Sequence, residues 1–263
     1  MSLKSYSNDS EIKASIKKNV KDHGCHISLI KSDGYNPSFG YTVGLTKQYN
    51  HPEIIVLGLD VESTHAILNS AFLDIKEGTK FITEIGYNGF LDGFEIQFVN
   101  VSGEYYSDYL GYAGWFNENS WNFKALQMVW PDKQSHFPWD SDFVEELKFR
   151  QPLLDRNLDF KFLELRSLSV FTTEDVLNGS TVTNVFHDEK GNWLFYSENG
   201  NDTNSTKIVR LEDLVKDDIT LNHIYFLNYG ESAFRKDKLS DWIIDSHPIR
   251  KVISDTLNND NES

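Results

Sequence analysis

The hydrophobic pattern of the first 25 residues predicts an amphipathic helix. Ile12, Ile16 and Val20 recur every four residues, which places them on one helical face. Gly24 stands where such a helix would stop, because glycine readily adopts the left-handed conformation that ends helices. We therefore expect a helix over about residues 10–21.

A second helical stripe lies between Asp60, an N-cap residue type, and Gly78, a stop signal. Its apolar positions have the spacing of a buried helix face: Ile67, Leu68, Ala71, Phe72 and Ile75. A third helix is predicted over 105–115, with these residues facing inward: Tyr106, Tyr109, Leu110 and Ala113.

Short apolar and β-branched runs between these helices predict strands. In chain order they cover about residues 26–30, 39–45, 54–59, 94–101 and 125–129. The run IIVLGL is apolar throughout, which is typical of a central strand. A turn cluster, DGYNP, separates the first two strands.

The pattern changes after Trp139. Residues 140–156 are helical in pattern and acidic at their start, and we place a domain boundary at residue 145. The rest is rich in strands, with short helical turns after Thr173 and after residue 211. Its strands are predicted over about 168–171, 181–187, 192–196 and 207–211, with the hairpin turn DEKG between the second and third.

These patterns predict an α+β protein of two domains, residues 1–145 and 146–255. Each would be a mixed or antiparallel sheet with a few packed helices. Residues 256–263 (TLNNDNES) are too polar to bury a core, so we expect a disordered tail.

The chain is acidic over its whole length. Its 263 residues carry 25 basic and 40 acidic side chains, a formal net charge of −15. Residues 1–150 contribute −7 (13 basic, 20 acidic) and the remainder −8 (12 basic, 20 acidic). Such a surface repels nucleic acid and anionic membranes and speeds encounter with a basic partner, although solubility alone would also explain it.

The cysteine content and the N-terminal residues bear on location. Cys25 is the single cysteine, which excludes an internal disulfide and fits a reducing compartment. Residues 1–20 contain no apolar core of signal-peptide length, and no run approaches the roughly 20 apolar residues that cross a bilayer. We expect a cytoplasmic protein, and the pattern leaves its oligomeric state open.

The densest motif is QMVWPDKQSHFPW, which joins Trp130, Asp132 and Trp139 with two prolines. Each proline restricts the residue before it, so the two tryptophans would stand on a rigid turn. Such a turn suits a ligand platform or a binding hot spot. The alternative, which the sequence favours, is that the tryptophans plug the end of the sheet and pack the domain boundary.

Polar groups also gather near the ends of two predicted strands. If His51 and Glu53 converge with their neighbours, they would line a pocket and could act as acid and base. The favoured alternative is that His51 shapes a turn with Pro52 while Glu53 is solvated. The ligand-pocket candidates are Tyr41, Thr42, His51, Glu53, Trp130, Asp132 and Trp139.

The chain carries no recognisable catalytic or cofactor motif. His23, Cys25 and His26 are of zinc-ligand type, but a structural zinc site needs four ligands and no second cluster follows. Phosphate loops, dinucleotide fingerprints and nucleophile elbows are absent from the sequence. We therefore predict no metal, no cofactor and no catalytic residue, and we lean toward a protein that is not an enzyme.

The first half resembles a family of uncharacterised domains, DUF4262. The resemblance rests on FGYTVGL (39–45), HPE followed by IIVLGL (51–59), and QMVWPD with FPW (127–139). The strand 94–101 before a tyrosine-rich helix stands between these motifs. The family name implies no reaction and supplies no catalytic residues.

Residues 169–241 more faintly resemble the immunity protein 33 family, DUF2185, through the segments 170–197 and 208–214. This resemblance implies a part in bacterial toxin systems, where immunity proteins bind and block a toxin. Contacts would then come from the acidic surface of this half and the polar loop 197–205. The partner-binding candidates are Asp188, Glu189, Trp193, Glu198 and Asp202.

Two functions of different classes follow. The leading hypothesis is a non-enzymatic cytoplasmic binding protein, an immunity-type inhibitor of a basic toxin. The alternative is a small-molecule-binding or enzymatic first half, with a pocket near Tyr41, His51, Glu53 and Trp130.

Overall fold

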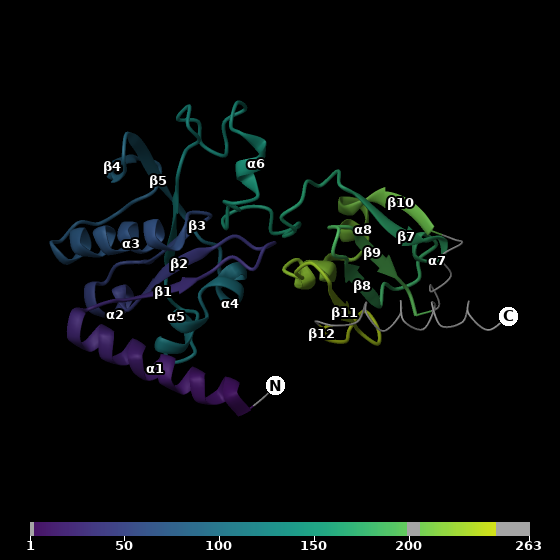
Figure 1. The fold of residues 1–263 in the computed structure, drawn as a ribbon, viewed down its shortest axis with the longest axis horizontal. Coiled ribbons are helices and arrows are strands. Elements are labelled where there is room, and N and C mark those ends of the chain that lie inside the picture. Colours follow the sequence, from purple (N-terminus) through teal and green to yellow (C-terminus); the bar gives the residue numbers. More distant parts are fainter. Residues whose placement is uncertain (1–2, 199–205, 246–263) are drawn as a thin grey trace. The chain divides into compact units, whose positions relative to one another are not determined.

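The computed structural model describes residues 3–198 and 206–245, and the chain divides into two compact units (Figure 1). Unit 1 takes Met1–Asp33 and Pro37–Leu158, and unit 2 takes Gly34–Asn36 and Asp159–Ser263. Each unit has its own six-stranded sheet, so the predicted α+β class with two mixed sheets is confirmed. The division into domains at residue 145 stays a prediction, since compactness does not test independent folding.

The sheet of unit 1 has the order β1-β2-β3-β6-β5-β4. Its strands are β1 (His26–Ile30), β2 (Phe39–Val43), β3 (Glu53–Leu57), β4 (Gly86–Leu91), β5 (Phe94–Asn100) and β6 (Ala125–Val129). The central strands β3 and β6 pair in parallel, and the other pairings are antiparallel. Every residue of β3 and β6 is buried, as the apolar run IIVLGL predicts for a central strand.

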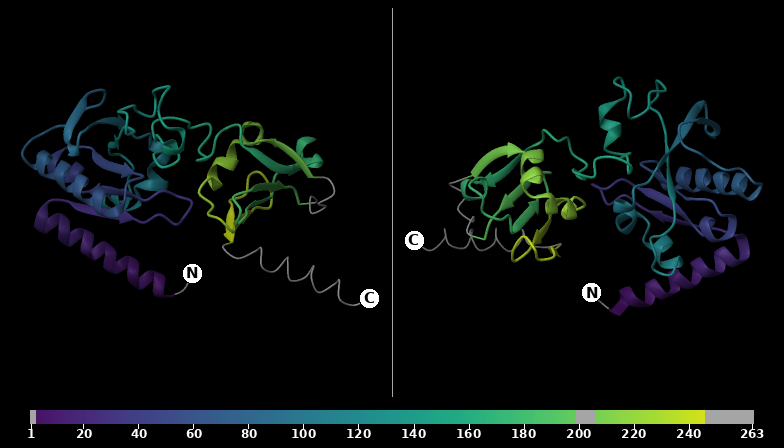
Figure 2. Two further views of the ribbon diagram at one scale, coloured as in Figure 1. Left: turned by 45° about the horizontal axis from the view of Figure 1, so that its top comes forward. Right: turned by 180° about the vertical axis from the view of Figure 1, so that it is seen from behind.

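The helical segments of unit 1 are α1 (Leu3–His23), α2 (Leu45–Tyr49), α3 (Val61–Lys76), η1 (Gly103–Tyr105), α4 (Tyr106–Tyr109), α5 (Gly111–Phe116) and α6 (Glu145–Lys148). Helix α3 packs on one face of the sheet (Figures 1 and 2). The carboxylate of Asp60 accepts the N–H of Ser63 at 2.8 Å, so the predicted N-cap is confirmed.

Successive side chains of a strand point to opposite faces of a sheet, and this alternation divides unit 1. Alternate residues of the inner strands join the predicted apolar stripe of α3 in one core: Ile54, Val56, Ile96, Phe98, Leu126 and Met128. The residues between them, such as Gln97 and Gln127, point to the opposite face of the sheet.

Two predicted helices differ from the structure. The predicted helix 105–115 is broken at Leu110, where φ is −117° and ψ is 31°, into η1, α4 and α5. The helix predicted over 140–156 is wrong, since only Glu145–Lys148 is helical. Beyond Lys148 the chain forms bends and turns, which are fixed by hydrogen bonds from the side chain of Gln151 to Trp130 and from that of Gln127 to Pro152 and Leu154.

The sheet of unit 2 has the order β10-β7-β9-β8-β11-β12. Its strands are β7 (Ser169–Thr173), β8 (Asn184–His187), β9 (Trp193–Tyr196), β10 (Thr206–Arg210), β11 (Glu231–Phe234) and β12 (Ile243–Asp245). In the part of unit 2 that the structure describes, short helical segments accompany it: α7 (Glu174–Leu177), α8 (Leu211–Asp217) and η3 (Ile219–Ile224). The predicted β8–β9 hairpin is confirmed, and the predicted tail 256–263 lies outside the described residues.

Within the two described stretches, none of the helices combines the length and apolar character needed to cross a membrane.

Candidate functional site

Glu53 is fully buried at the start of β3, so its predicted solvation is wrong. Its Oε1 accepts the N–H groups of Gly44 and Thr46, each at 3.1 Å. Its Oε2 accepts the hydroxyl of Thr42 at 2.7 Å and the N–H of Leu45 at 3.3 Å. Burial raises the pKa of the carboxyl, and these four hydrogen bonds oppose that rise. The carboxylate therefore caps the N-terminus of α2, although Glu53 itself belongs to β3.

His51 is also buried and has its own partners. Its Nδ1 lies 2.7 Å from the carbonyl oxygen of Pro52, and its Nε2 lies 3.1 Å from the backbone nitrogen of Phe81. Nδ1 therefore carries the proton and Nε2 accepts, which is the neutral form of the ring. Burial lowers the pKa of His51 and favours the same form. His51 and Glu53 thus hold different backbone segments and form no acid–base pair with each other.

Trp130 is buried rather than displayed. Its Nε1–H donates to the carbonyl oxygen of Leu57 at 2.8 Å. Its backbone N–H and C=O both bond to the side-chain amide of Gln151, each at 2.8 Å. The interpretation of this tryptophan as a plug against the sheet therefore agrees with its surroundings.

Asp132 organises the turn that follows. Its Oδ1 accepts the N–H groups of Gln134 at 2.8 Å and His136 at 2.9 Å, and its Oδ2 accepts that of Val144 at 3.3 Å. Burial by itself would raise the pKa of Asp132, but these backbone hydrogen bonds outweigh it and the pKa lies below its ordinary value. Asp132 is a turn-forming residue that fixes the approach to Trp139.

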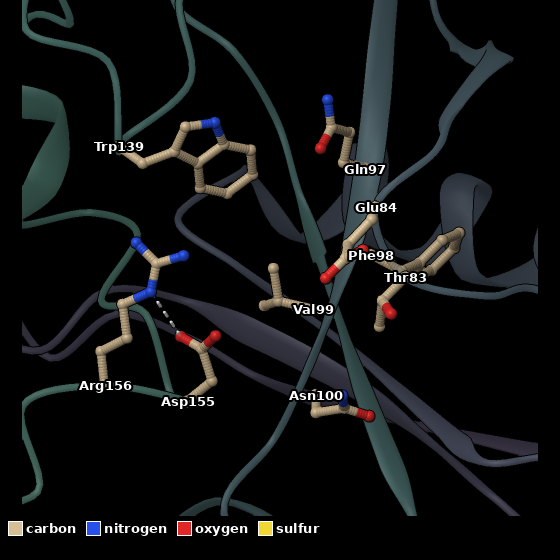
Figure 3. Close-up of a pocket in the computed structure, with 9 residues that line it drawn as sticks. All are labelled: Thr83, Glu84, Gln97, Phe98, Val99, Asn100, Trp139, Asp155 and Arg156. Carbon is tan, nitrogen blue, oxygen red and sulfur yellow. Dashed lines mark ion pairs between the residues drawn. The ribbon is translucent and has the colours of Figure 1, made fainter.

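Trp139 lines a cavity of about 320 Å³ in unit 1, which we call the Trp139 cavity (Figure 3). This volume is at the lower end of the range for small-ligand sites. Six polar residues line it together with the indole: Thr83, Glu84, Gln97, Asn100, Asp155 and Arg156. The cavity lies on the sheet face opposite α3, because Gln97 alternates with the core residues of β5.

The indole of Trp139 is held in place by its neighbours. It stacks on Phe137 with ring centroids 4.9 Å apart and planes 6° apart. The guanidinium carbon of Arg156 lies 5.6 Å from the ring centroid. Figure 3 shows the indole reaching from its loop toward β5, with Arg156 and Asp155 beside it. Trp139 is thus a positioned aromatic surface.

The charges of the Trp139 cavity are partly compensated. Arg156 is its one cationic lining residue, and its Nε lies 3.3 Å from Oδ1 of Asp155. Glu84 adds a second carboxylate to the lining. An entering anion would therefore meet two carboxylates and a cation that is already paired, which disfavours phosphates and carboxylic acids.

Two glutamine side chains fix the segment that carries Asp155 and Arg156. Gln127 of β6 donates through Nε2 to the carbonyl oxygen of Pro152, and its Oε1 accepts the N–H of Leu154, each at 3.0 Å. Gln151 makes the matching pair with the backbone of Trp130. These side-chain hydrogen bonds thus connect β6 and Trp130 to residues 151–154, where no backbone strand pairing does so. The sequence pattern included Gln127 but gave no sign of this role.

Tyr41 lies elsewhere in unit 1, at a second cavity of about 290 Å³. Its hydroxyl accepts the N–H of Tyr112 at 3.2 Å, and burial raises its pKa to about 12. The seven pocket candidates therefore do not converge. Tyr41 and Trp139 line separate cavities, and the other five are structural.

The partner-binding candidates of unit 2 differ in exposure. Glu189 and Glu198 are exposed, and Asp202 lies outside the described residues. Asp188 closes the β8–β9 turn by accepting the N–H groups of Lys190 and Asn192, each at 2.8 Å.

Trp193, the remaining partner-binding candidate, is fully buried. It donates through Nε1 to Glu164 at 2.6 Å and stacks on His187, with ring centroids 4.1 Å apart. Its ring is therefore part of the core of unit 2 and not a surface anchor.

Metal ligation and a cysteine nucleophile are the remaining kinds of candidate chemistry. Among residues 3–198 and 206–245, no three His, Cys, Asp or Glu side chains gather as a metal site would require. Cys25 is buried, and its thiol is far from ionisation because burial raises its pKa.

Comparison with known proteins bears on unit 1. Residues 19–144 match the family model described as "Domain of unknown function (DUF4262)", which confirms the resemblance of the first half. No curated protein and no solved structure matches the chain. The resemblance of residues 169–241 to the immunity protein 33 family stays a prediction.

Proposed function

We propose that this protein is a non-enzymatic binding protein whose unit 1 holds a small polar ligand in the Trp139 cavity. The observation that carries the proposal is the placement of Trp139 against a polar cavity of ligand size, stacked on Phe137 and flanked by Arg156. Small-molecule sites combine aromatic surface with polar groups that fix the orientation of the ligand.

Binding is favoured over catalysis because the acid–base candidates have other tasks. His51 and Glu53 are both buried, and each is engaged by backbone groups. A general acid or base must reach the proton that it transfers, and these side chains face backbone groups instead.

The lining of the cavity favours an uncharged ligand. Gln97, which points to the cavity face of the sheet, carries both a donor and an acceptor, and the guanidinium of Arg156 is paired. A small neutral ligand with several hydroxyl or amide groups would satisfy these side chains without placing an anion beside Glu84.

A thermal-shift and calorimetric screen of neutral and phosphorylated small molecules tests the proposal. We expect a neutral ligand to bind the full chain and to lose about tenfold or more in affinity in Trp139→Ala. Trp121→Ala is the matched control, because Trp121 is half-exposed and lines neither cavity. Ligands that bind both variants equally would contradict the proposal.

A second candidate function is the immunity-type inhibition of a basic toxin in the cytoplasm. One observation favours it: Glu189 is exposed at a hairpin tip that Asp188 makes rigid. Charge at a rigid tip suits electrostatic steering of a basic partner. Pull-down at low and high salt tests it. A basic partner that is lost at high salt and in Glu189→Lys would support it, and a partner unaffected by both would count against it.

A further inference from the structure

The cavity beside Tyr41, the Tyr41 cavity, is lined chiefly by aromatic rings. Five such side chains from β2, α4 and α5 line its volume of about 290 Å³: Phe39, Tyr41, Tyr109, Tyr112 and Trp115. Asp9 and Lys13 of α1 also line it, as do Ile30, Ser107, Asp108 and Gly111, and Figure 1 shows α1 running beside β1 and α5. This lining differs in kind from the amides and carboxylates of the Trp139 cavity, so the two cavities suit different ligands.

A cation of the protein itself already sits at this aromatic wall. The Nζ atoms of Lys13 and Lys17 each lie 5.4 Å from the ring centroid of Trp115, within cation–π range. Lys13 Nζ also lies 2.7 Å from Oδ2 of Asp9. An ammonium group is thus held between an indole and a carboxylate, the pair of partners that recognises alkylated ammonium ligands in aromatic cages.

The remaining polar groups maintain a cation-attracting site. Asp9 also accepts the hydroxyl of Tyr112 at 3.2 Å, and its hydrogen bond with Lys13 keeps its pKa below the ordinary value. Tyr41 stays a neutral phenol at physiological pH. The lining therefore offers two carboxylates, Asp9 and Asp108, together with uncharged rings.

We propose that the Tyr41 cavity binds an organic ammonium cation of the quaternary or methylated amine class, in the position that Lys13 occupies in the free protein. A lysine ammonium is compact and strongly hydrated, so holding it at an aromatic wall costs hydration energy. An alkylated ammonium is larger and less hydrated and fills more of the cavity. The side chains of Lys13 and Asp9 are 33% and 44% exposed, so Lys13 can swing into solvent when the ligand enters.

This inference is independent of the Trp139 cavity, and choline is the probe that tests it. We expect choline to bind the full chain at least about fivefold more tightly than 3,3-dimethylbutan-1-ol, its uncharged isostere, as a cation–π contact requires. Incorporated 5-fluorotryptophan reports the site, because only the resonance of Trp115 should move. Equal binding of the two probes, or binding of neither, would overturn the inference.

Variants of α1 provide the second arm of the test. Lys13→Gln removes one of the two lysine ammonium groups at Trp115, the one paired with Asp9, and should tighten choline binding severalfold. Lys18→Gln is the matched control, because Lys18 is an exposed lysine of the same helix that does not line the cavity. Unchanged or weaker choline binding in Lys13→Gln would contradict the displacement of Lys13. Trp115→Leu should abolish binding, and the Lys13 variant keeps the test decisive if that substitution prevents folding.

Discussion

The carboxylate of Glu53 accepts the hydroxyl of Thr42 at 2.7 Å, and both side chains are completely buried in unit 1. Thr42 in turn accepts the N–H of Ile54 through the same oxygen at 2.8 Å. This contact joins β2 to β3 and directs the carboxylate at the first N–H groups of α2. Glu53, which its residue type suggests as an acid or base beside His51, is instead part of the framework that joins β2, β3 and α2.

We expect Glu53→Gln to lower the free energy of unfolding by about 2–4 kcal/mol. Glutamine keeps one acceptor oxygen but turns an NH₂ group toward two donors: either the N–H groups of Gly44 and Thr46, or the N–H of Leu45 and the hydroxyl of Thr42. Urea unfolding at pH 7 measures the loss, and amide hydrogen exchange at Gly44 and Thr46 locates it. Glu62→Gln, an exposed substitution in the first turn of α3, is the control and should change stability by less than about 0.5 kcal/mol. Equal stability of the two variants would contradict the structural role of Glu53.

Two buried histidines should make the fold sensitive to mild acid. Burial lowers the pKa of His51 and of His187, although a hydrogen bond to the Leu227 carbonyl opposes the shift at His187. A histidine with a lowered pKa in the folded state stabilises the fold above the unfolded value of about 6.5, and this contribution is lost as pH falls toward the folded pKa.

The midpoint of unfolding should therefore drop between pH 7 and pH 5. His51→Gln should flatten that dependence, whereas His65→Gln, at an exposed position, should leave it as in the wild type. Thermal melts in matched ionic strength measure the effect. A midpoint that does not change over this range would be inconsistent with neutral buried histidines.

Asp132→Asn should loosen the turn before Trp139. An asparagine oxygen cannot replace both carboxylate oxygens that accept from His136 and Val144. Asparagine can keep the oxygen that serves Gln134 and His136, so we expect amide exchange at Val144, which loses its acceptor, to speed up by about tenfold. Asp142→Asn is a matched change at an exposed position nearby and should have no such effect. Unaltered exchange in Asp132→Asn would show that the turn does not depend on this side chain.

Gln127→Leu should detach the segment that carries Arg156. The substitution leaves the N–H of Leu154 and the C=O of Pro152 without their partner in a buried place, at a cost of about 2–4 kcal/mol. Urea unfolding measures the cost, and Gln48→Leu at an exposed site is the control. A loss below about 1 kcal/mol would mean that the segment is held by other contacts.

Local patterns were sufficient for the parts of the fold that depend on neighbouring residues. The N-cap Asp60, the buried stripe of α3 and the central strand β3 all follow from residue type and spacing over a few positions. These signals are short-range, and so they survive in the folded protein.

The candidate site could be predicted only in part, because its contacts are long-range. A glutamate before an apolar strand is ordinarily solvated, and nothing near Glu53 reveals that the β2–β3 pairing brings donors from residues 42–46 to it. Trp139 was identified from its motif, but Arg156 and Gln97 reach it only through the Gln127 and Gln151 bonds and the order of the sheet.

Binding of a small neutral ligand in the Trp139 cavity is tested most directly by fluorine NMR of the tryptophans. The chain has six tryptophans, and 5-fluorotryptophan labelling gives each its own fluorine resonance, with that of Trp139 assigned through Trp139→Phe. Titration with the ligand found by screening should shift the Trp139 resonance and leave that of Trp193, buried in unit 2, unchanged. A ligand that binds the full chain without moving the Trp139 resonance would contradict the claim.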